Sequence, residues 1–199
     1  MKILLISSNT ATSPYPIYPL GLGIIAAALT AAGHDVLQVD ILQKNASLDA
    51  VAAEIVNFNP GLIGISVRNI DNVNLMHEQY YIDTVRNIVT TIRNISKSKI
   101  ILGGAGFSLL PELILKETGA DYGIVGEGEA LIVEFAGNAA NGIYPETRIL
   151  GSNTRLSGTQ MFSARYNDDL IQYYLQSGNI VSVQTKRGCT HKCVYCSYP

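Results

Sequence analysis

The sequence predicts an α/β fold, a doubly wound five-stranded parallel sheet with helices on both faces. Short apolar runs, typical of strands buried on both faces, alternate five times with longer segments of helical character. This alternation requires crossover connections, which are right-handed and place helices on both sides of a parallel sheet. The chain has 199 residues, of which 47% are hydrophobic, so it can bury a sizeable core.

Local signals justify each element in turn. Gly33 ends an alanine-rich helix, Ser47 can cap the next helix, and Pro60 breaks it. Isoleucine and valine recur at helical spacing in the third helix, and Gly128 precedes the last one. The strands are expected at residues 2–7, 36–39, 62–66, 99–102 and 122–125. The helices are expected at residues 20–32, 48–57, 75–95 and 108–117 and from residue 128 onward.

The pattern does not continue through residues 138–179. This stretch is rich in Gly, Asn, Ser and Thr, with one short helical run at 168–176. We expect it to be a linker that joins an α/β domain over residues 1–137 to the start of a second domain over 180–199. Within the last segment, the β-branched run at 180–185 predicts a strand that leads into a cysteine loop.

Composition narrows the classes of partner. The formal net charge is −2 and the sequence pI is about 5.9, which argues against a nucleic-acid partner or an anionic membrane surface. Only four apolar residues follow Lys2, so a signal peptide is not expected. The longest apolar run, residues 20–32, is too short to span a bilayer. We expect a cytoplasmic protein, where thiols stay reduced.

The three cysteines of the chain lie close together near its end. Cys189, Cys193 and Cys196 have the spacing C-x3-C-x2-C. Three thiolates on a short loop can hold three irons of a four-iron cluster and leave the fourth iron open to a substrate or cosubstrate. The alternatives are a cramped zinc site with His191 as fourth ligand, or a disulfide with an odd thiol in an exported protein.

Residues 187–196 resemble the cluster loop of the radical S-adenosylmethionine (radical SAM) enzymes, including its Arg-Gly lead-in and the aromatic Tyr195. The resemblance implies a [4Fe-4S] cluster on the three cysteines and S-adenosylmethionine on the open iron, next to Tyr195. It also implies a reduced donor of ferredoxin or flavodoxin type, whose electron yields a 5′-deoxyadenosyl radical. A radical SAM barrel extends far beyond this loop. The chain is therefore expected to be the front part of a longer enzyme, inactive alone, with residues 180–185 as the first barrel strand.

Glycines and small polar residues gather at the carboxyl ends of the expected strands. Ligands of open α/β sheets bind at this edge, where glycine lets them approach the backbone and free amides can donate hydrogen bonds. The simpler interpretation is that the glycines end strands, that residues 68–72 form a solvated loop, and that acids begin a helix. The candidate ligand residues are Ser8, Asn9, Leu20, Gly21, Ser66, Val67, Arg68, Asn69, Gly103, Gly104, Ala105, Glu127, Gly128 and Glu129.

A non-catalytic binding module with a dinucleotide site at this edge is one alternative. Gly21-x-Gly23-x-x-Ala26 matches the dinucleotide fingerprint, and Asp40 ends the second strand, where a ribose acceptor would lie. The fingerprint requires a tight turn directly after the first strand. Here a loop with three prolines separates the strand from Gly21, so the glycines fit helix packing better.

Four short pieces, at residues 18–22, 31–36, 101–104 and 125–129, resemble the cobalamin-binding domain that precedes the barrel in a class of radical SAM enzymes. The resemblance covers residues 2–135 and implies a Rossmann-like or flavodoxin-like fold. It also implies that cobalamin lies across the strand ends and takes part in radical methyl transfer, ring closure or a related C–H functionalisation. The alternative is a radical SAM enzyme whose N-terminal domain binds substrate or a partner instead.

One departure from many B12 domains concerns the cobalt ligand. The usual Asp-x-His-x-x-Gly loop after the first strand is absent from this sequence. His34 is expected at the opposite end of the sheet, and the surroundings of His77 match no ligand motif. We therefore expect cobalamin to bind without a protein histidine on cobalt.

Overall fold

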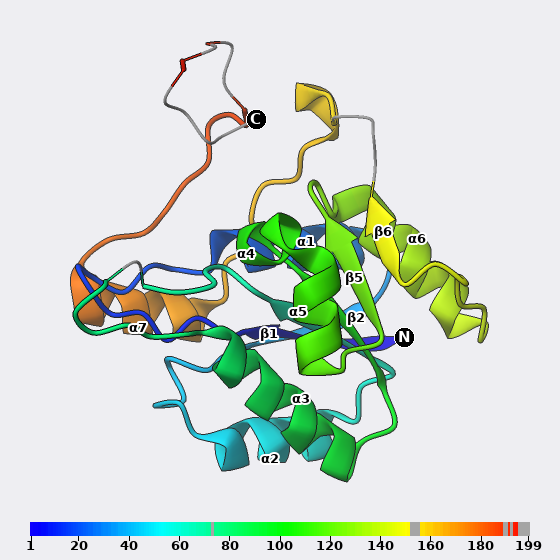
Figure 1. Cartoon of the computed structure of the whole chain (residues 1–199). Coiled ribbons are helices and arrows are strands. Elements are labelled where there is room, and N and C mark those ends of the chain that lie inside the picture. Colours follow the sequence, from blue (N-terminus) through cyan, green and yellow to red (C-terminus); the bar gives the residue numbers. More distant parts are fainter. Residues whose placement is uncertain (73, 152–155, 189–190, 192, 195–199) are drawn as a thin grey trace.

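The computed structural model confirms the parallel α/β fold and adds a sixth strand (Figure 1). It describes residues 1–72, 74–151, 156–188, 191 and 193–194. Every neighbouring pair of strands is parallel, in the order β2-β1-β3-β4-β5-β6. The strands are β1 Lys2–Ser7, β2 Asp35–Asp40, β3 Leu62–Ser66, β4 Lys99–Gly103, β5 Tyr122–Val125 and β6 Ile149–Gly151.

Helices cover both faces of this sheet. Helices α1 and α6 pack on one face, and α2, α3 and α5 pack on the other (Figure 1). Side chains of β1 alternate between the two cores: Ile3 and Leu5 lie under α1 and α6, whereas Leu4 and Ile6 lie on the other face. The helices are α1 Leu20–Ala31, α2 Leu48–Phe58, α3 Ile82–Ile95, α4 Ala105–Leu109, α5 Pro111–Thr118, α6 Glu129–Ala140 and α7 Asp168–Gly178, with a 3-10 turn at Gly158–Gln160.

The third helix is shorter than predicted. It begins at Ile82, and Leu75, expected on its apolar face, is fully exposed. The Asn72 side chain closes the preceding segment into a loop. It donates to the His77 carbonyl at 2.7 Å and accepts from the Gln79 amide at 3.0 Å. Asparagine side chains that bond to nearby backbone compete with helix formation, which explains the late start.

The helix predicted at 108–117 is two helices. Helix α4 ends at Leu109 and α5 starts at Pro111. Proline has no amide hydrogen and is favoured at the first helical position, and it pushes the preceding residue out of the helical region. Leu110 accordingly has φ −139° and ψ 60°. Elsewhere the Ser47 cap of α2 is confirmed, because its hydroxyl accepts from the Ala50 amide at 3.2 Å.

The expected number of five strands and the strand expected at 180–185 are both wrong. Strand β6 forms within the stretch expected to be a linker and extends the sheet beside β5. The strand predicted at 180–185 does not form, and no strand of the described residues lies beside it to satisfy its backbone groups. Val183 in this segment is 74% exposed. The division of the chain near residues 137 and 179 stays a prediction.

Gly104 is a glycine that the fold requires. Its φ of 102° and ψ of 170° fall in a region open essentially to glycine alone, and an added Cβ would lie 2.5 Å from the Val67 carbonyl oxygen.

We expect Gly104→Ala to lower the free energy of unfolding by about 2 kcal/mol or more in urea titrations. The matched control is Gly137→Ala in α6, where nothing lies within 4 Å, and it should raise stability by about 0.5–1 kcal/mol. Equal stability of Gly104→Ala and the wild type would contradict this account.

Candidate functional site

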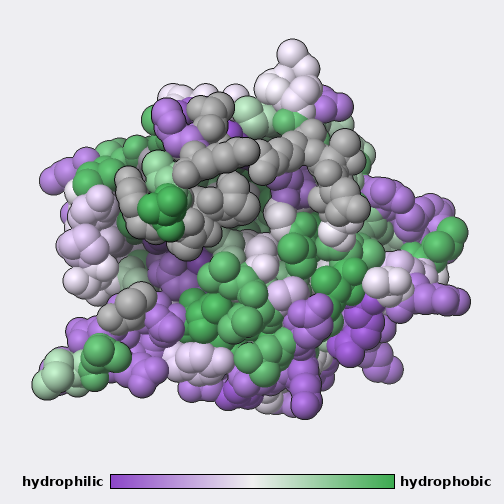
Figure 2. All heavy atoms as spheres, turned by 45° about the horizontal axis from the view of Figure 1, so that its top comes forward, coloured by the Kyte–Doolittle hydropathy of each residue, from purple (hydrophilic) through white to green (hydrophobic). Residues whose placement is uncertain are grey.

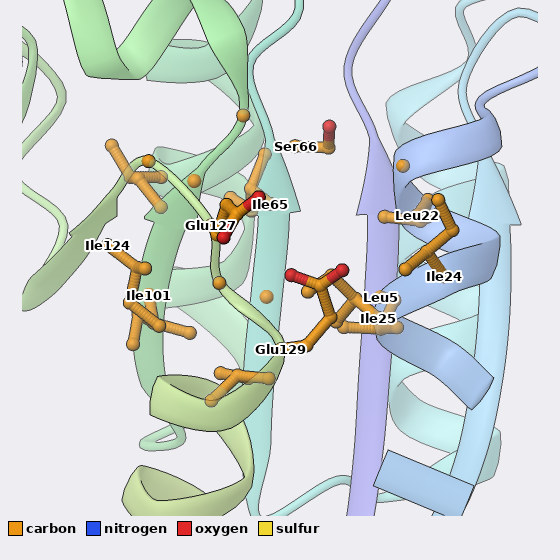
Figure 3. A pocket seen from close by; sticks show the side chains of 18 of the residues that line it. Leu5, Leu22, Ile24, Ile25, Ile65, Ser66, Ile101, Ile124, Glu127 and Glu129 are labelled. Carbon is orange, nitrogen blue, oxygen red and sulfur yellow. The ribbon is translucent and has the colours of Figure 1, made fainter. Parts of the chain in front are cut away.

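The order of strands reverses at β1, whose neighbours are β2 on one side and β3 on the other. In open α/β sheets, ligands bind outside the carboxyl ends of the strands at such a point. A cavity of about 310 Å³ opens there, between the sheet and helices α1 and α6 (Figure 3). The topology and the cavity therefore coincide at the edge that the sequence indicated.

The inner part of the cavity is apolar. Leu5, Ile101 and Ile124 line it from three strands, and further apolar side chains come from α1 and α6. Gly64 of β3 pairs in register with Leu5 of β1, and a Cβ on Gly64 would lie 2.8 Å from a Leu5 methyl carbon. The hollow thus depends on a strand glycine between large neighbours. The helix residues on its walls are Leu20, Leu22, Ile24, Ile25 and Ile132.

The mouth of the cavity is bare backbone with a few polar groups. Gly21 and Gly126 both line it, and a Cβ on either residue would meet no atom within 4 Å. The Gly126 amide donates to the Ser108 hydroxyl at 3.0 Å, so what the two glycines offer a ligand is close approach to backbone that carries no side chain. The remaining polar groups of the rim are Ser66, Glu127, Glu129, Gln184 and Arg187.

Two acidic side chains reach over the strand ends. Figure 3 shows the Glu129 carboxylate, at the start of α6, directed into the middle of the cavity. Its side chain is only 3% exposed and forms an ion pair with the Arg187 guanidinium. Glu127 lies 3.7 Å from the same guanidinium and accepts a hydrogen bond from the Leu156 amide at 2.6 Å. A buried carboxylate is costly unless paired, so Arg187 is the counterion that this site needs.

The structure brings eight of the fourteen predicted ligand residues to this cavity. They are Leu20, Gly21, Ser66, Gly103, Gly104, Glu127, Gly128 and Glu129. The other six do not line it: Ser8, Asn9, Val67, Arg68, Asn69 and Ala105. Sequence reasoning missed Gly126, Gln184, Arg187 and the apolar walls. The interior glycine of β3 was the one local signal for a hollow there.

Of the predicted ligand residues that do not line the cavity, Ser8 and Asn9 are buried and Arg68 is exposed. Ser8 is buried and its hydroxyl donates to the Ser66 carbonyl at 2.9 Å, which ties β1 to β3. Asn9 is 6% exposed, and neither its amide nitrogen nor its carbonyl oxygen has a hydrogen-bond partner in the described part of the chain. Buried polar groups are normally satisfied, but Asn9 does not line the cavity, so its contact with a ligand stays a prediction.

Helix α7 occupies the other side of the strand reversal, over the end of β2. Tyr174 donates its hydroxyl to the fully buried Asp40 at 3.1 Å, and the Leu42 and Gln43 amides donate to the other carboxylate oxygen. Burial raises the pKa of Asp40, opposed by these hydrogen bonds. Burial also raises the pKa of Tyr174. Asp40 therefore has a structural role.

This placement weakens the dinucleotide alternative. Both oxygens of Asp40 are engaged inside the protein, so the carboxylate is not available to a ribose. Gly23 lies within α1, where a Cβ would come within 3.1 Å of the Arg165 carbonyl oxygen. Its role is close packing against the segment before α7, as the sequence indicated.

Neither candidate histidine lies at the cavity. His34 is at the opposite end of the sheet, with Nδ1 3.3 Å from the terminal amino group of Met1. Burial and this amino group lower the pKa of His34. His77 is exposed in the loop before α3. No histidine is among the residues that line the cavity in the described part of the chain.

The cysteine loop is described only in part. Cys193 is a free, exposed thiol. Cys189, Cys196 and Tyr195 lie outside the described residues, so the cluster and the S-adenosylmethionine contact stay predictions. Among the described residues, no three His, Cys, Asp or Glu side chains are grouped to hold a metal ion.

Exposed apolar side chains lie on the helices that follow β4. Leu109 is 71% exposed, and Leu110 and Leu113 are also exposed. Figure 2, which tips the top of Figure 1 toward the reader, shows apolar groups gathered among polar ones in the middle of this face.

Among the described residues, no helix is long and apolar enough to cross a membrane.

A doubly wound sheet with a glycine-rimmed apolar cavity at its strand reversal defines an α/β ligand-binding domain. The particular family follows from sequence: residues 6–136 match the B12 binding domain, and the chain belongs to this family. The prediction of a cobalamin-binding domain is thereby confirmed.

Relatives with known names extend this result. The chain is 23% identical to a tryptophan 2-C-methyltransferase of Streptomyces laurentii, over 92% of this chain and 41% of the relative. It is 26% identical to an uncharacterized methyltransferase of Pyrococcus horikoshii, over 99% of this chain and 45% of the relative. The chain thus spans less than half the length of these curated relatives.

Solved structures agree with both the fold and the family. The radical S-adenosylmethionine methyltransferase TsrM of Kitasatospora setae superposes with a TM-score of 0.67 at 29% identity, over 72% of this chain and 26% of TsrM. The cobalamin-dependent S-adenosylmethionine radical enzyme OxsB superposes with a TM-score of 0.53 at 18% identity, over 69% of this chain and 19% of OxsB, which supports the fold alone.

Proposed function

We propose that this chain is the cobalamin-binding part of a cobalamin-dependent radical SAM enzyme that carries out methyl transfer or a related C–H functionalisation or ring closure. The observation behind this proposal is the cavity at the strand reversal of a B12 binding domain, whose rim includes Arg187, two residues before the first cysteine of a C-x3-C-x2-C loop. A structure of TsrM, 29% identical to this chain, contains both cobalamin and a [4Fe-4S] cluster.

The residues present fit the chemistry of cobalamin. Cobalamin is a corrin ring edged with amide side chains, with a nucleotide tail that ends in an apolar benzimidazole. The cavity, about 310 Å³, is too small for the whole cofactor, but its size and apolar walls suit one flat apolar ring such as the benzimidazole. The bare backbone at Gly21 and Gly126 would let the corrin edge approach closely, and polar rim side chains such as Ser66 and Glu127 suit its amide groups.

Cobalt would be left without a protein imidazole, because neither His34 nor His77 lies at the cavity. When bound, cobalamin supplies a transferable methyl group or a redox-active cobalt. The chain's own contribution is to bind and orient the cofactor. The apolar walls would exclude water from the buried part of the cofactor, and the polar side chains and bare backbone of the rim would fix its position.

The cysteine loop would supply the second cofactor site. Cys189, Cys193 and Cys196 would hold a [4Fe-4S] cluster, with S-adenosylmethionine on the open iron and Tyr195 beside it. A reduced donor of ferredoxin or flavodoxin type would deliver the electron. The exposed Cys193 thiol is compatible with a ligand on an open loop.

Cobalamin binding is tested with hydroxocobalamin and the purified chain. We expect the wild type to retain corrin absorbance after gel filtration. Gly21→Phe should weaken binding about tenfold or more, because the ring would occupy the mouth of the cavity. The matched control is Gly137→Phe, an exposed position on α6 with nothing within 4 Å, and it should bind like the wild type. A wild type that retains no corrin would contradict cobalamin binding and favour a domain for substrate or a partner.

The cluster is tested in the full-length protein that contains this chain. Anaerobic reconstitution with iron and sulfide should give the broad visible absorbance of an iron–sulfur cluster. Serine at Cys189, Cys193 or Cys196 should abolish it, because each thiolate is a ligand. His191→Ala should leave it unchanged, whereas a zinc site that uses His191 would be colourless and sensitive to this change. Survival of the cluster in all three serine variants would overturn the assignment.

A further inference from the structure

Arg187 contacts three different acceptors with its three guanidinium nitrogens. Nε donates to the Gln184 side-chain oxygen at 3.0 Å. Nη1 lies 3.7 Å from a Glu127 carboxylate oxygen, and Nη2 pairs with Glu129. One hydrogen bond to Gln184 and two ion pairs to glutamates, made by three different nitrogens of a planar group, together hold the guanidinium in place.

The pair with Glu129 is the one that matters most for the energy of this arrangement. The Glu129 side chain is 3% exposed and the Arg187 side chain 19% exposed, so solvent screens their attraction little. Ile25 and Ile132 line the same cavity, and apolar neighbours make an unpaired carboxylate costly. The amino end of α6 gives Glu129 partial compensation, and Arg187 gives it a full opposite charge.

These contacts hold a segment that has no regular secondary structure. Residues 180–188 form neither helix nor strand, so their position depends on individual contacts. One is the Tyr166 hydroxyl, which donates to the Ser182 carbonyl at 2.8 Å. The other is the Arg187 cluster, defined as Arg187 with Gln184, Glu127 and Glu129. All four members of the cluster line the cavity, so this segment is part of its wall.

We propose that Arg187 is a positioning residue that makes the lead-in of the cysteine loop one wall of the cofactor cavity. Filling the cavity and holding the start of the cysteine loop are then energetically coupled. A ligand that packs against this wall restrains residues 184–187, and by linkage a restrained wall binds the ligand more tightly. The coupling rests on the proposed function, because it takes cobalamin as the ligand.

The cluster itself is tested without any ligand, by backbone ¹⁵N relaxation on the isotope-labelled whole chain. Arg187→Gln should lower the order parameters of residues 180–188 to below about 0.6, the range of flexible backbone, while β1, β3 and β4 keep the values of rigid backbone. Glu129→Gln, which removes only the charge, should have the same effect, and the double variant should add nothing further.

The matched control is Lys186→Gln, which removes the same charge from a neighbour that makes no ion pair in the described part of the chain. Its order parameters should match those of the wild type. Order parameters over 180–188 that are unchanged in both Arg187→Gln and Glu129→Gln would overturn the positioning role. The sheet strands report in the same spectra that each variant is folded.

The coupling is tested by adding hydroxocobalamin to the wild type, Lys186→Gln and Arg187→Gln. It should raise the order parameters of residues 180–188 in the wild type and Lys186→Gln, and bind Arg187→Gln about tenfold more weakly in absorbance titrations. Equal affinity in the wild type and Arg187→Gln would overturn the coupling and leave cobalamin binding intact. A wild type that binds no hydroxocobalamin overturns the proposed function and the coupling together, and the ligand-free relaxation measurement still decides whether Arg187 holds the segment.

Discussion

The reversal of strand order at β1 is the constraint on which the rest of this structure depends. Strands β2 and β3 lie on opposite sides of β1. The connections that lead to them, with α1 and α2, therefore run over opposite faces of the sheet and diverge above the strand ends. The space left over one face becomes the cavity, since Gly64 of β3 fills none of it. Helix α7 covers the adjacent edge, above β2, through the Tyr174 to Asp40 hydrogen bond. The same topology thus gives one open site and one closed edge.

At the open site, the Arg187 guanidinium pairs with two glutamates. Glu127 and Glu129 stand at the end of β5 and the start of α6, where helix geometry alone would favour acids. Arg187, far along the chain, brings the segment before the cysteines to them. In a cobalamin-dependent radical SAM enzyme, this would place the entrance of the cluster loop against the rim of the cofactor cavity. The two cofactors would then share a boundary made from one chain.

Most of the sheet could be predicted from sequence, because its five longer strands are apolar runs that need no partner to be recognised. Strand β6 could not, since Ile149–Gly151 is only three residues long and forms by pairing with β5. The late start of α3 depends on side-chain bonds of Asn72 that compete with an otherwise good helical pattern. The strand expected at 180–185 failed for the opposite reason, because β-branched residues alone do not form a strand without a neighbour.

The glycines of the candidate site could be predicted from the sequence. The side-chain contacts between residues far apart in the chain could not. Glycines at strand ends have a local signature, and Gly21, Gly103, Gly104 and Gly128 line the cavity as expected. The role of Arg187 has no such signature: it sits beside cysteines in the sequence and beside Glu129 only in space. The apolar walls could not be predicted either, because a residue that lines a cavity and a residue that packs in the core have the same hydrophobic periodicity in the sequence.

The central claim is that the cavity under α1 and α6 receives part of cobalamin. Amide chemical-shift mapping of the labelled chain with hydroxocobalamin tests this most directly. The account predicts the largest changes at Gly21, Gly64, Gly103 and Gly126, with little change at Asn59 and Gly119 on the far end of the sheet. Shifts confined to residues remote from the cavity, or no shifts at all, would contradict it.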